Sequence, residues 1–462
     1  MMRESKGNVA IITAVLIAVM MLILVFQLFL QAPEEIFWEK TVTEVSEGID
    51  LAVVGGSAAA LMVALEAAEN GANVNLFPHG QDLGKDCFFL VKEGLAAIGT
   101  PPQKEVNLEL TASEFKNLIQ QQGGDISNPL LLNYFVNEAE YFYFRIEKKG
   151  GVSFDSLPLP ERKPYLHFSS SPEPASSFKE KLLSDLERLG VIFRNETVKE
   201  INFSPQERVE SLLIEDRKGK LSTLFLQGVI LADGGYSADI TRWHDFFPKG
   251  DNYIQLRPSQ KGFGLQLAAD QGADIIQTEF LNKRIALYFP QEEAHLSLPE
   301  WALEEALLVN TEGEILNGNQ FETDRFFSFV LNSPADEVYI IVPEETALAL
   351  EAPDFFSTFE ELENMVETYS LAGPGELQER GVPVSPYYIA PVKGGVDYTL
   401  GGVAVTPFGE VIKGEKVLRG LYAAGEIAGG LHGEALLPGM ALSEALFLSW
   451  TAGKASAEYV SH

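Results

Sequence analysis

A short turn near residue 55 has the composition of a phosphate-binding turn. Gly55, Ser57 and Ala60 occupy the three small-residue positions of a G-x-G-x-x-G pattern, with Gly56 between the first two. In that pattern the backbone approaches a pyrophosphate at a helix start, where N–H groups and the helix dipole favour an anion. Ala60 still permits close packing, but the Cβ of Ser57 stands where the phosphates should approach. Taken alone, the turn leaves a dinucleotide site open, and equally the alternatives of a generic α/β turn or a site for another nucleotide.

The elements around this turn form a βαβ unit. The apolar run Ile49–Val54 predicts a buried strand, and Asn73–Phe77 predicts the next one. Between them Ala58–Asn70 is rich in alanine and leucine, which predicts a helix that Gly71 ends. An acid for a ribose hydroxyl is expected after the second strand, but Pro78 stands there.

Length and charge limit the function classes. A chain of 462 residues can hold two domains, and a formal net charge of −32 repels nucleic acid and anionic lipid. The acidic surface is either a well-solvated exterior or a docking face for a basic redox partner. A single cysteine, Cys87, excludes an internal disulfide and a cysteine-based metal site. We therefore expect neither nucleic acid nor a metal as a partner.

The N-terminal segment Val9–Leu30 predicts a transmembrane helix. Its only polar side chains are Thr13 and Gln27. At 1.5 Å per residue it is long enough to cross the ~30 Å hydrocarbon core. Arg3 and Lys6 precede it, so the positive-inside rule places the N-terminus in the cytoplasm and the remaining chain outside. A cleaved signal peptide is the alternative, with a shorter apolar region expected.

Four further segments resemble, in order, those of the flavoprotein subunits of the fumarate reductase and succinate dehydrogenase family. They are Val229–Ser237 (VILADGGYS), Gln260–Asp274 (QKGFGLQLAADQGAD), Tyr398–Val403 (YTLGGV) and Gly420–Gly433 (GLYAAGEIAGGLHG), the last followed by the helix-like Leu437–Leu446. They are similar to that family's VILATGG, TGDG-x-x-MA, HTMGG and GLYAAGE-x-x-GG-x-HG segments. The resemblance extends from about Gly48 to Tyr459.

The resemblance implies an α/β fold: a Rossmann-like FAD-binding domain with an inserted α+β capping domain, here preceded by one transmembrane helix. It divides the chain into an N-terminal tail, anchor and linker (1–47), a first part of the FAD domain (48–282), the cap (283–374) and a last part of the FAD domain (375–462). We expect non-covalent FAD, because Gln81–Glu93, where covalent members carry a histidine, contains none.

The resemblance also assigns residues to the cofactor. The phosphates would meet Gly55, Gly56, Ser57 and Ala60; the adenosine half Gly234 and Gly235; the ribityl chain Gly425 and the Glu426 carboxylate; and the flavin ring the backbone of Gly439, Met440, Ala441 and Leu442. Amides at that last helix start would favour negative charge on a reduced flavin.

The residues that hold dicarboxylates in the family are largely missing. Leu436 and Ile315 align with arginines of the family, and Tyr398 aligns with a histidine. Because a guanidinium fork binds a carboxylate bidentately, these losses argue against fumarate or succinate as substrate. The remaining candidates for proton transfer are His432, Tyr398 and Arg325.

Two functions follow from these observations. The first is a membrane-anchored FAD oxidoreductase that transfers a hydride between flavin and a small substrate, with an unidentified electron donor or acceptor. The second is a catalytically degenerate binding or structural protein with the same fold. Ser57, Pro78, Asp233 and Leu436 favour the second, Asp233 because it adds a negative charge near the phosphates. Glu426 and its glycine-rich surroundings favour the first.

Overall fold

The computed structural model describes residues 43–45, 48–158, 160–243, 253–289, 294–298, 302–303, 306–310, 314–317, 323–333, 338–349, 357–358 and 387–462. The predicted anchor Val9–Leu30 lies outside these ranges. Among the helices that are described, none combines the length and the apolarity needed to span a membrane.

The described residues form two hydrophobic cores, and the part of the molecule around the larger core is called the larger body below. A six-stranded sheet forms its centre, in the order β21-β22-β10-β2-β3-β6. Its strands are β2 (Leu51–Val54), β3 (Val74–Phe77), β6 (Ile192–Phe193), β10 (Gly228–Leu231), β21 (Glu410–Lys413) and β22 (Lys416–Ala423). All neighbouring pairs are parallel except β21 with β22. The strands β2, β3 and β10 are buried throughout, as expected for a parallel sheet covered on both faces.

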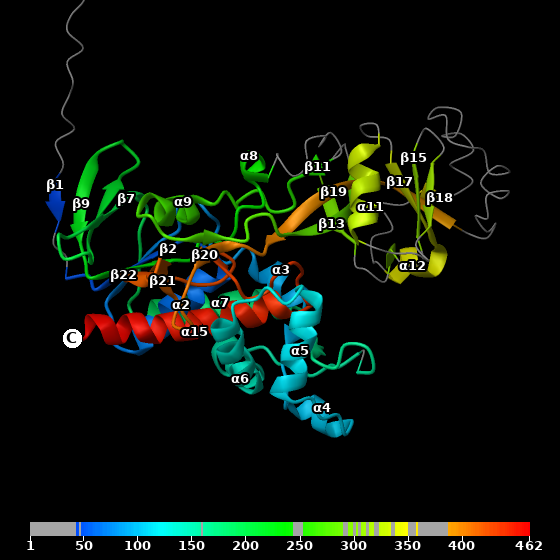
Figure 1. Cartoon of the computed structure of the whole chain (residues 1–462), viewed down its shortest axis with the longest axis horizontal. Helices are drawn as coiled ribbons and strands as arrows, with labels where there is room; N and C mark the ends of the chain where they lie inside the picture. The colour runs from blue at the N-terminus through cyan, green and yellow to red at the C-terminus, as the bar shows by residue number, and fades with distance from the viewer. Residues whose placement is uncertain are drawn as a thin grey trace, which may run out of the picture. The chain divides into compact units, whose positions relative to one another are not determined.

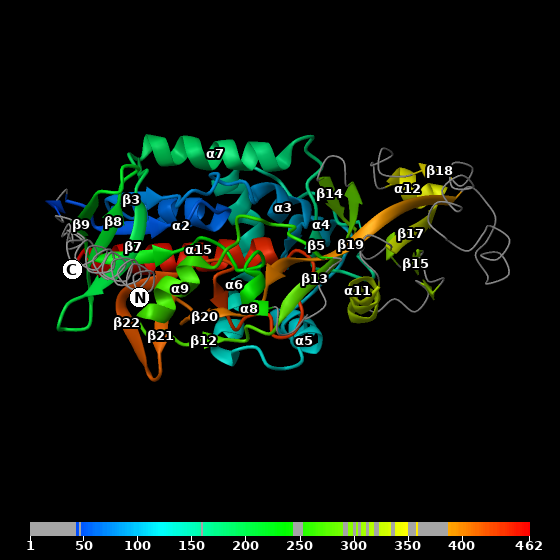
Figure 2. The same cartoon turned by 90° about the horizontal axis from the view of Figure 1, so that it is seen from above.

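The predicted βαβ unit is confirmed. Helix α2 (Ala58–Glu69) connects β2 to β3, and Leu51 pairs with Val74 in the register of these strands. Helices α7 (Pro174–Arg188) and α15 (Met440–Val460) both pack against α2 (Figures 1 and 2). Nine of the twelve α2 residues are buried, because a helix covered on more than one side needs apolar or small residues all round.

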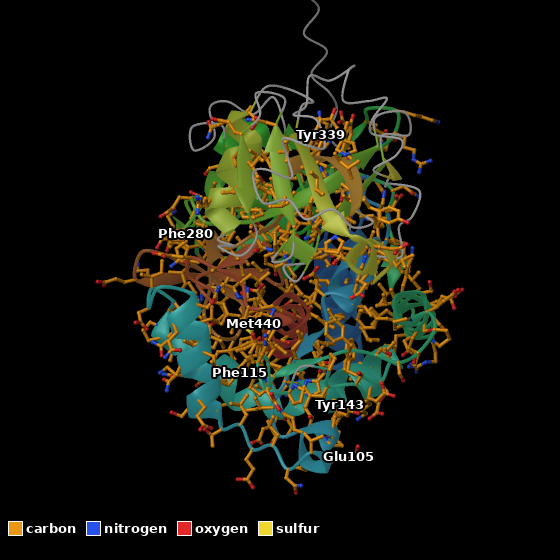
Figure 3. The ribbon with its side chains drawn as sticks, turned by 90° about the vertical axis from the view of Figure 1, so that its right-hand side faces the viewer. Glu105, Phe115, Tyr143, Phe280, Tyr339 and Met440 are labelled. Carbon is orange, nitrogen blue, oxygen red and sulfur yellow. The ribbon has the colours of Figure 1, made fainter. Side chains whose placement is uncertain are left out.

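Smaller elements complete this body. They are the helices α3 (Cys87–Lys92), α4 (Pro101–Glu105), α5 (Ala112–Gln122), α6 (Pro129–Arg145), η1 (Ile146–Gly150), α8 (Ile240–Trp243) and α9 (Phe263–Asp270), and the strands β1 (Thr43–Val45), β4 (Leu95–Ala96), β5 (Leu166–His167), β7 (Thr197–Phe203), β8 (Val209–Glu215), β9 (Leu221–Phe225), β12 (Ile275–Ile276), β20 (Gly402–Ala404) and β23 (Ala428–Gly429). Figure 3 shows Met440, the first residue of α15, inside this body and the exposed Glu105 at its edge.

A second sheet has its own hydrophobic core, which includes Leu308, Phe326 and Ile340. Its strands are β11 (Tyr253–Ile254), β13 (Leu281–Phe289), β14 (Ala294–Ser297), β15 (Leu307–Asn310), β16 (Ile315–Asn317), β17 (Val338–Pro343), β18 (Ser357–Thr358) and β19 (Tyr387–Thr399); its helices are α11 (Thr323–Asn332) and α12 (Glu344–Ala349). The antiparallel strands β13 and β19 extend from this sheet to the larger body. The predicted domain boundaries stay a prediction.

Candidate functional site

The phosphate-type turn is shaped by close backbone contacts. Gly55 has φ = +132°, and a Cβ there would stand 2.4 Å from the Ala232 carbonyl oxygen, so only glycine fits. Ser57 caps α2: its Oγ accepts from the Ala60 N–H at 3.1 Å and donates to the Ala232 carbonyl at 2.6 Å. The Ser57 side chain thereby ties the start of α2 to β10.

Two side chains that the sequence did not predict accept hydrogen bonds from the backbone N–H groups of this turn. The Asp86 carboxylate accepts from the Ala58 N–H at 2.7 Å, and the side-chain Oε1 of Gln81 accepts from the Gly56 N–H at 2.7 Å. The Gln81 amide group also donates to the Asp233 carbonyl at 2.7 Å. A carboxylate at a helix N-terminus satisfies the same N–H groups and dipole that would bind a phosphate. The chain's own side chains therefore take the place of phosphate oxygens.

Glu426, the predicted partner of the ribityl chain, is paired with Arg257. The Arg257 Nη1 donates to the Glu426 carboxylate at 2.6 Å, and the Arg257 Nη2 lies 3.7 Å from the Asp86 carboxylate. The other Glu426 oxygen accepts from the Thr399 N–H at 2.9 Å. Burial raises the pKa of Glu426, and the Arg257 guanidinium opposes that rise. Arg257, which no motif indicated, thus links the predicted phosphate and ribityl positions.

The paired glycines also lie against side chains of the chain. A Cβ on Gly234 would stand 2.0 Å from the side-chain Oε1 of Gln260, and one on Gly235 would stand 2.3 Å from a Glu426 carboxylate oxygen. Asp233 accepts from the Gly264 N–H at 2.8 Å. Burial raises the pKa of Asp233 to about 7. The negative charge predicted for Asp233 is therefore incomplete at neutral pH.

The cofactor path, meaning the residues that the resemblance assigns to FAD from the turn at Gly55 to the start of α15, can be tested for its fit to FAD. Four buried polar atoms along it have no hydrogen-bond partner among the described residues: His79 Nδ1, Asp233 Oδ1, Gln260 Oε1 and Glu444 Oε1. Such atoms are rare in native interiors and indicate a missing partner. The unpaired atoms and the glycines fit a bound cofactor. However, Gln81 and Asp86 already accept from the Gly56 and Ala58 N–H groups, and Arg257 already pairs with Glu426. For FAD to use these groups, the three side chains have to move.

Two of the three residues predicted for proton transfer, Tyr398 and His432, contact the same carboxylate. It belongs to Glu444, which the sequence did not indicate. The Tyr398 hydroxyl donates to Glu444 at 2.5 Å, and His432 Nε2 lies 3.0 Å from the same oxygen. All three side chains are at most 2% exposed. Burial and the neighbouring Glu444 raise the pKa of Tyr398 well above its usual value, so the tyrosine keeps its proton. The spacing of Glu444 after Gly439 placed it on a helix but gave no sign of this contact.

The remaining predicted residues are placed as follows. Arg325 is exposed on α11, outside the buried cluster of Tyr398, Glu444 and His432. Gly439 begins α15 with φ = +79° and without a side-chain cap, and Met440, Ala441 and Leu442 behind it are buried. Gly425 has φ = +77° and closely approaches the Cβ of Ala59 in α2.

A second arginine is held between carboxylates beside this region. Arg284 Nε donates to Asp397 at 2.8 Å, and Arg284 Nη2 donates to Glu93 at 3.0 Å. Asn282 donates to the other Asp397 oxygen at 2.8 Å. Because Asp397 directly precedes Tyr398 on β19, this network fixes the strand that carries the cluster.

Comparisons with known proteins agree with this geometry. The FAD binding domain family matches residues 50–442. A NADH:fumarate oxidoreductase of Klebsiella pneumoniae (strain 342) is 24% identical over 455 residues, covering 88% of this chain and 48% of that protein. A fumarate reductase (cytochrome) of Shewanella frigidimarina is 22% identical over 454 residues, covering 89% and 77%. The chain thus spans about half of the first relative and about three quarters of the second.

Solved structures show the same fold. The open conformation of a flavocytochrome c3 fumarate reductase matches with a TM-score of 0.80 at 19% identity, over 90% of this chain and 79% of that one. A 3-ketosteroid-Δ4-(5α)-dehydrogenase of Rhodococcus jostii RHA1, in complex with 4-androstene-3,17-dione, matches with a TM-score of 0.65 at 17% identity, over 92% and 99%. The chain therefore belongs to the FAD binding domain family, and FAD is the cofactor that this membership assigns to it.

Proposed function

We propose that this chain is a membrane-anchored FAD-dependent oxidoreductase that transfers a hydride between flavin and a small substrate other than fumarate or succinate. The observation that carries this proposal is the buried cluster of Tyr398, Glu444 and His432 at the start of α15. Bound FAD would supply the hydride chemistry. The protein would supply orientation, exclusion of water and one proton.

Tyr398 is the proton-transfer group in this proposal. It is neutral, because burial and Glu444 raise its pKa, and a neutral phenol suits an uncharged substrate. In the structure the Tyr398 hydroxyl donates its hydrogen bond to Glu444. In the reaction it would instead donate to an oxygen or carbon of the substrate, which would receive the proton. His432 shares the same Glu444 oxygen and would return a proton through it.

The charges around the cluster support a substrate without carboxylates. Arg257 and Arg284 both bind carboxylates of the protein itself. Leu436 and Ile315 stand where relatives of the resembled family carry arginines. A dicarboxylate would therefore meet apolar side chains and buried acids, which desolvate it without pairing. The solved structure of the steroid dehydrogenase fold neighbour is a complex with 4-androstene-3,17-dione, an uncharged ketone.

The apolar segment Val9–Leu30 supports anchoring in a membrane, and the basic residues before it support a catalytic part outside the cytoplasm. The electron donor or acceptor is a separate partner, and the net charge of −32 favours one with a basic docking face.

A degenerate binding protein is the second candidate. It is favoured by one specific observation: Asp86, Gln81 and Arg257 already satisfy the groups that would hold the phosphates and the ribityl chain. In that case the fold would be stable without cofactor, and FAD would bind weakly.

The visible absorption spectrum of the purified full chain, in mild detergent, separates the two candidates. An oxidoreductase is expected to show bound flavin that is released as FAD on denaturation, in a ratio near one per chain. The Asp82→Asn protein, changed at an exposed carboxylate, should load equally. A folded, colourless chain that takes up no added FAD would contradict the proposal and leave the binding protein.

A further inference from the structure

A pocket of about 350 Å³ lies between α2, α6, η1 and α15. Helices α2 and α6 both pack against α15, which closes the floor of this pocket (Figure 1). Its lining begins at Met62 of α2 and Leu446 of α15, more than one turn behind the starts of these helices. No residue that the resemblance assigns to FAD lines it. The pocket is therefore separate from the cofactor path, and its volume is within the range of small-ligand sites.

The walls of this pocket are largely apolar and aromatic. Tyr141 and Phe144 of α6 and Trp450 of α15 contribute three rings to it. Tyr141 is 54% exposed and Phe144 is 48% exposed, so two large rings face water at the pocket. A flat apolar body placed against them would remove that surface from water and allow ring–ring contacts. The walls thus favour a ligand with an aromatic part.

Arg145 is fixed at the pocket and has one donor nitrogen left over. Its Nη2 donates to Glu138 at 2.6 Å, and its guanidinium carbon lies 3.7 Å from the centre of the Trp450 ring. Its Nη1 is buried and has no hydrogen-bond partner among the described residues. Because buried polar atoms are nearly always paired, this nitrogen indicates a missing acceptor. An oxygen of a ligand in the pocket would supply it.

The π-helical turn η1, which continues α6, adds two lysines to the pocket. Such turns are rare and are frequent at functional sites. Lys149 lies 3.4 Å from Glu66 and also pairs with Glu69. Lys148 is exposed, and no described residue forms an ion pair with it. Its charge is therefore available to an anion in the pocket.

We propose that this pocket binds a small aromatic monocarboxylate. The ring of the ligand lies against Tyr141 and Phe144, and its carboxylate accepts from Arg145 Nη1 with Lys148 nearby. A single negative charge suits the site, since the carboxylates that already hold Arg145 and Lys149 would repel a phosphate dianion more strongly. The proposal goes beyond the oxidoreductase function and does not depend on it, because the pocket lies outside the cofactor path.

Titration calorimetry on the purified full chain, in an uncharged detergent, tests the proposal with three probes: 2-naphthoate, 2-naphthalenemethanol and acetate. We expect the naphthoate to bind. The alcohol lacks the charge and acetate lacks the rings, so each should bind at least tenfold more weakly. Binding of the naphthoate should weaken as salt is raised, and added FAD should not displace it.

Two variants locate the binding. Tyr141→Ala removes an exposed ring and should raise the dissociation constant of 2-naphthoate about tenfold. Tyr134→Ala, exposed on the same helix but outside the pocket, is the matched control and should leave that constant unchanged. Arg145→Lys keeps a positive charge for Glu138 but removes the planar fork, so it should also weaken binding about tenfold. Thermal unfolding without probe checks that each variant is folded.

The proposal is overturned if 2-naphthoate does not bind, if the alcohol or acetate binds as tightly, or if FAD displaces the naphthoate. It is also overturned if the folded Tyr141 and Arg145 variants both bind the naphthoate like the control.

Discussion

The starts of α2 and α15 are the two helix starts that the resemblance assigns to FAD, and their capping differs. At α2 the Ser57 hydroxyl caps the helix, and the Asp86 carboxylate accepts from the Ala58 N–H. At α15 the N-cap residue is Gly439, which supplies no side-chain hydrogen bond to the helix start. The phosphate-side helix start is filled by the protein's own acid, while the flavin-side helix start has no acid on it.

This difference gives the two helix starts different capacities for an anionic ligand. A helix start without a cap keeps its positive end for negative charge on a ligand. A helix start with its own carboxylate has lost that capacity until the carboxylate moves. The proton-transfer cluster lies at the start of α15, and the ion pairs of Arg257 extend from the start of α2. Four changes of single residues test this contrast.

The largest effect is expected at the flavin end, for Tyr398→Phe. If Tyr398 delivers the proton, this change should lower turnover about 10²–10⁴-fold while the flavin spectrum is retained. Small uncharged compounds are first screened for one that reoxidises the photoreduced flavin of the unchanged protein. The measurement is the rate of flavin reoxidation by that compound. Tyr459→Phe, on the distant end of the same α15, is the control. Equal rates for the Tyr398 variant and the control would remove Tyr398 from the mechanism.

The next largest effect is a loss of stability, expected for Glu426→Ala. Glu426 is paired with Arg257, which also lies near Asp86 at the start of α2. The Arg257 guanidinium, whose side chain is 10% exposed, would lose its partner at 2.6 Å. Breaking a buried ion pair on one side costs up to about 3–5 kcal/mol. The cost here is smaller than that by what the second carboxylate, Asp86 at 3.7 Å, still compensates. Denaturant unfolding of the protein without cofactor should show this loss, and the exposed Glu415→Ala should not. A loss below about 1 kcal/mol would mean that Arg257 finds another partner.

The sequence predicted much of the frame and only part of the site. The βαβ unit and the glycine turns were predictable because local composition and backbone conformation determine them. His432 and Tyr398 were found through a resemblance. Their meeting on Glu444 was not, because it depends on how β19 and α15 pack.

Arg257, Asp86 and Gln81 were missed for a similar reason. They belong to no motif, and their contacts join segments far apart in the chain, such as Arg257 with Glu426. A sequence can show that a motif has changed, but it does not show which distant side chain has taken over the motif's hydrogen bonds.

A smaller effect is expected at the phosphate end, for Asp86→Asn. The amide oxygen can still accept from the Ala58 N–H, but the negative charge is removed. If Asp86 competes with the phosphates of FAD, the dissociation constant of FAD should fall about tenfold, as judged from quenching of flavin fluorescence. The matched control is Asp82→Asn, whose side chain is 78% exposed. Unchanged FAD binding would show that Asp86 does not compete with the phosphates, and weaker binding would show that it supports the cofactor.

The smallest effect concerns Asp233, between the two ends. Burial raises its pKa from 3.8 to about 7, so the folded protein holds this proton to higher pH than the unfolded chain does. The resulting stabilisation is complete below pH 3.8 and is lost as the pH rises through 7. Between pH 6 and pH 8 the free energy of unfolding should fall by about 1 kcal/mol because of this group. Asp233→Asn, which keeps an acceptor for the Gly264 N–H, should remove that slope, so the difference between the two unfolding curves isolates it. Parallel curves would mean that Asp233 is ionised throughout, in which case its charge opposes the phosphates together with that of Asp86.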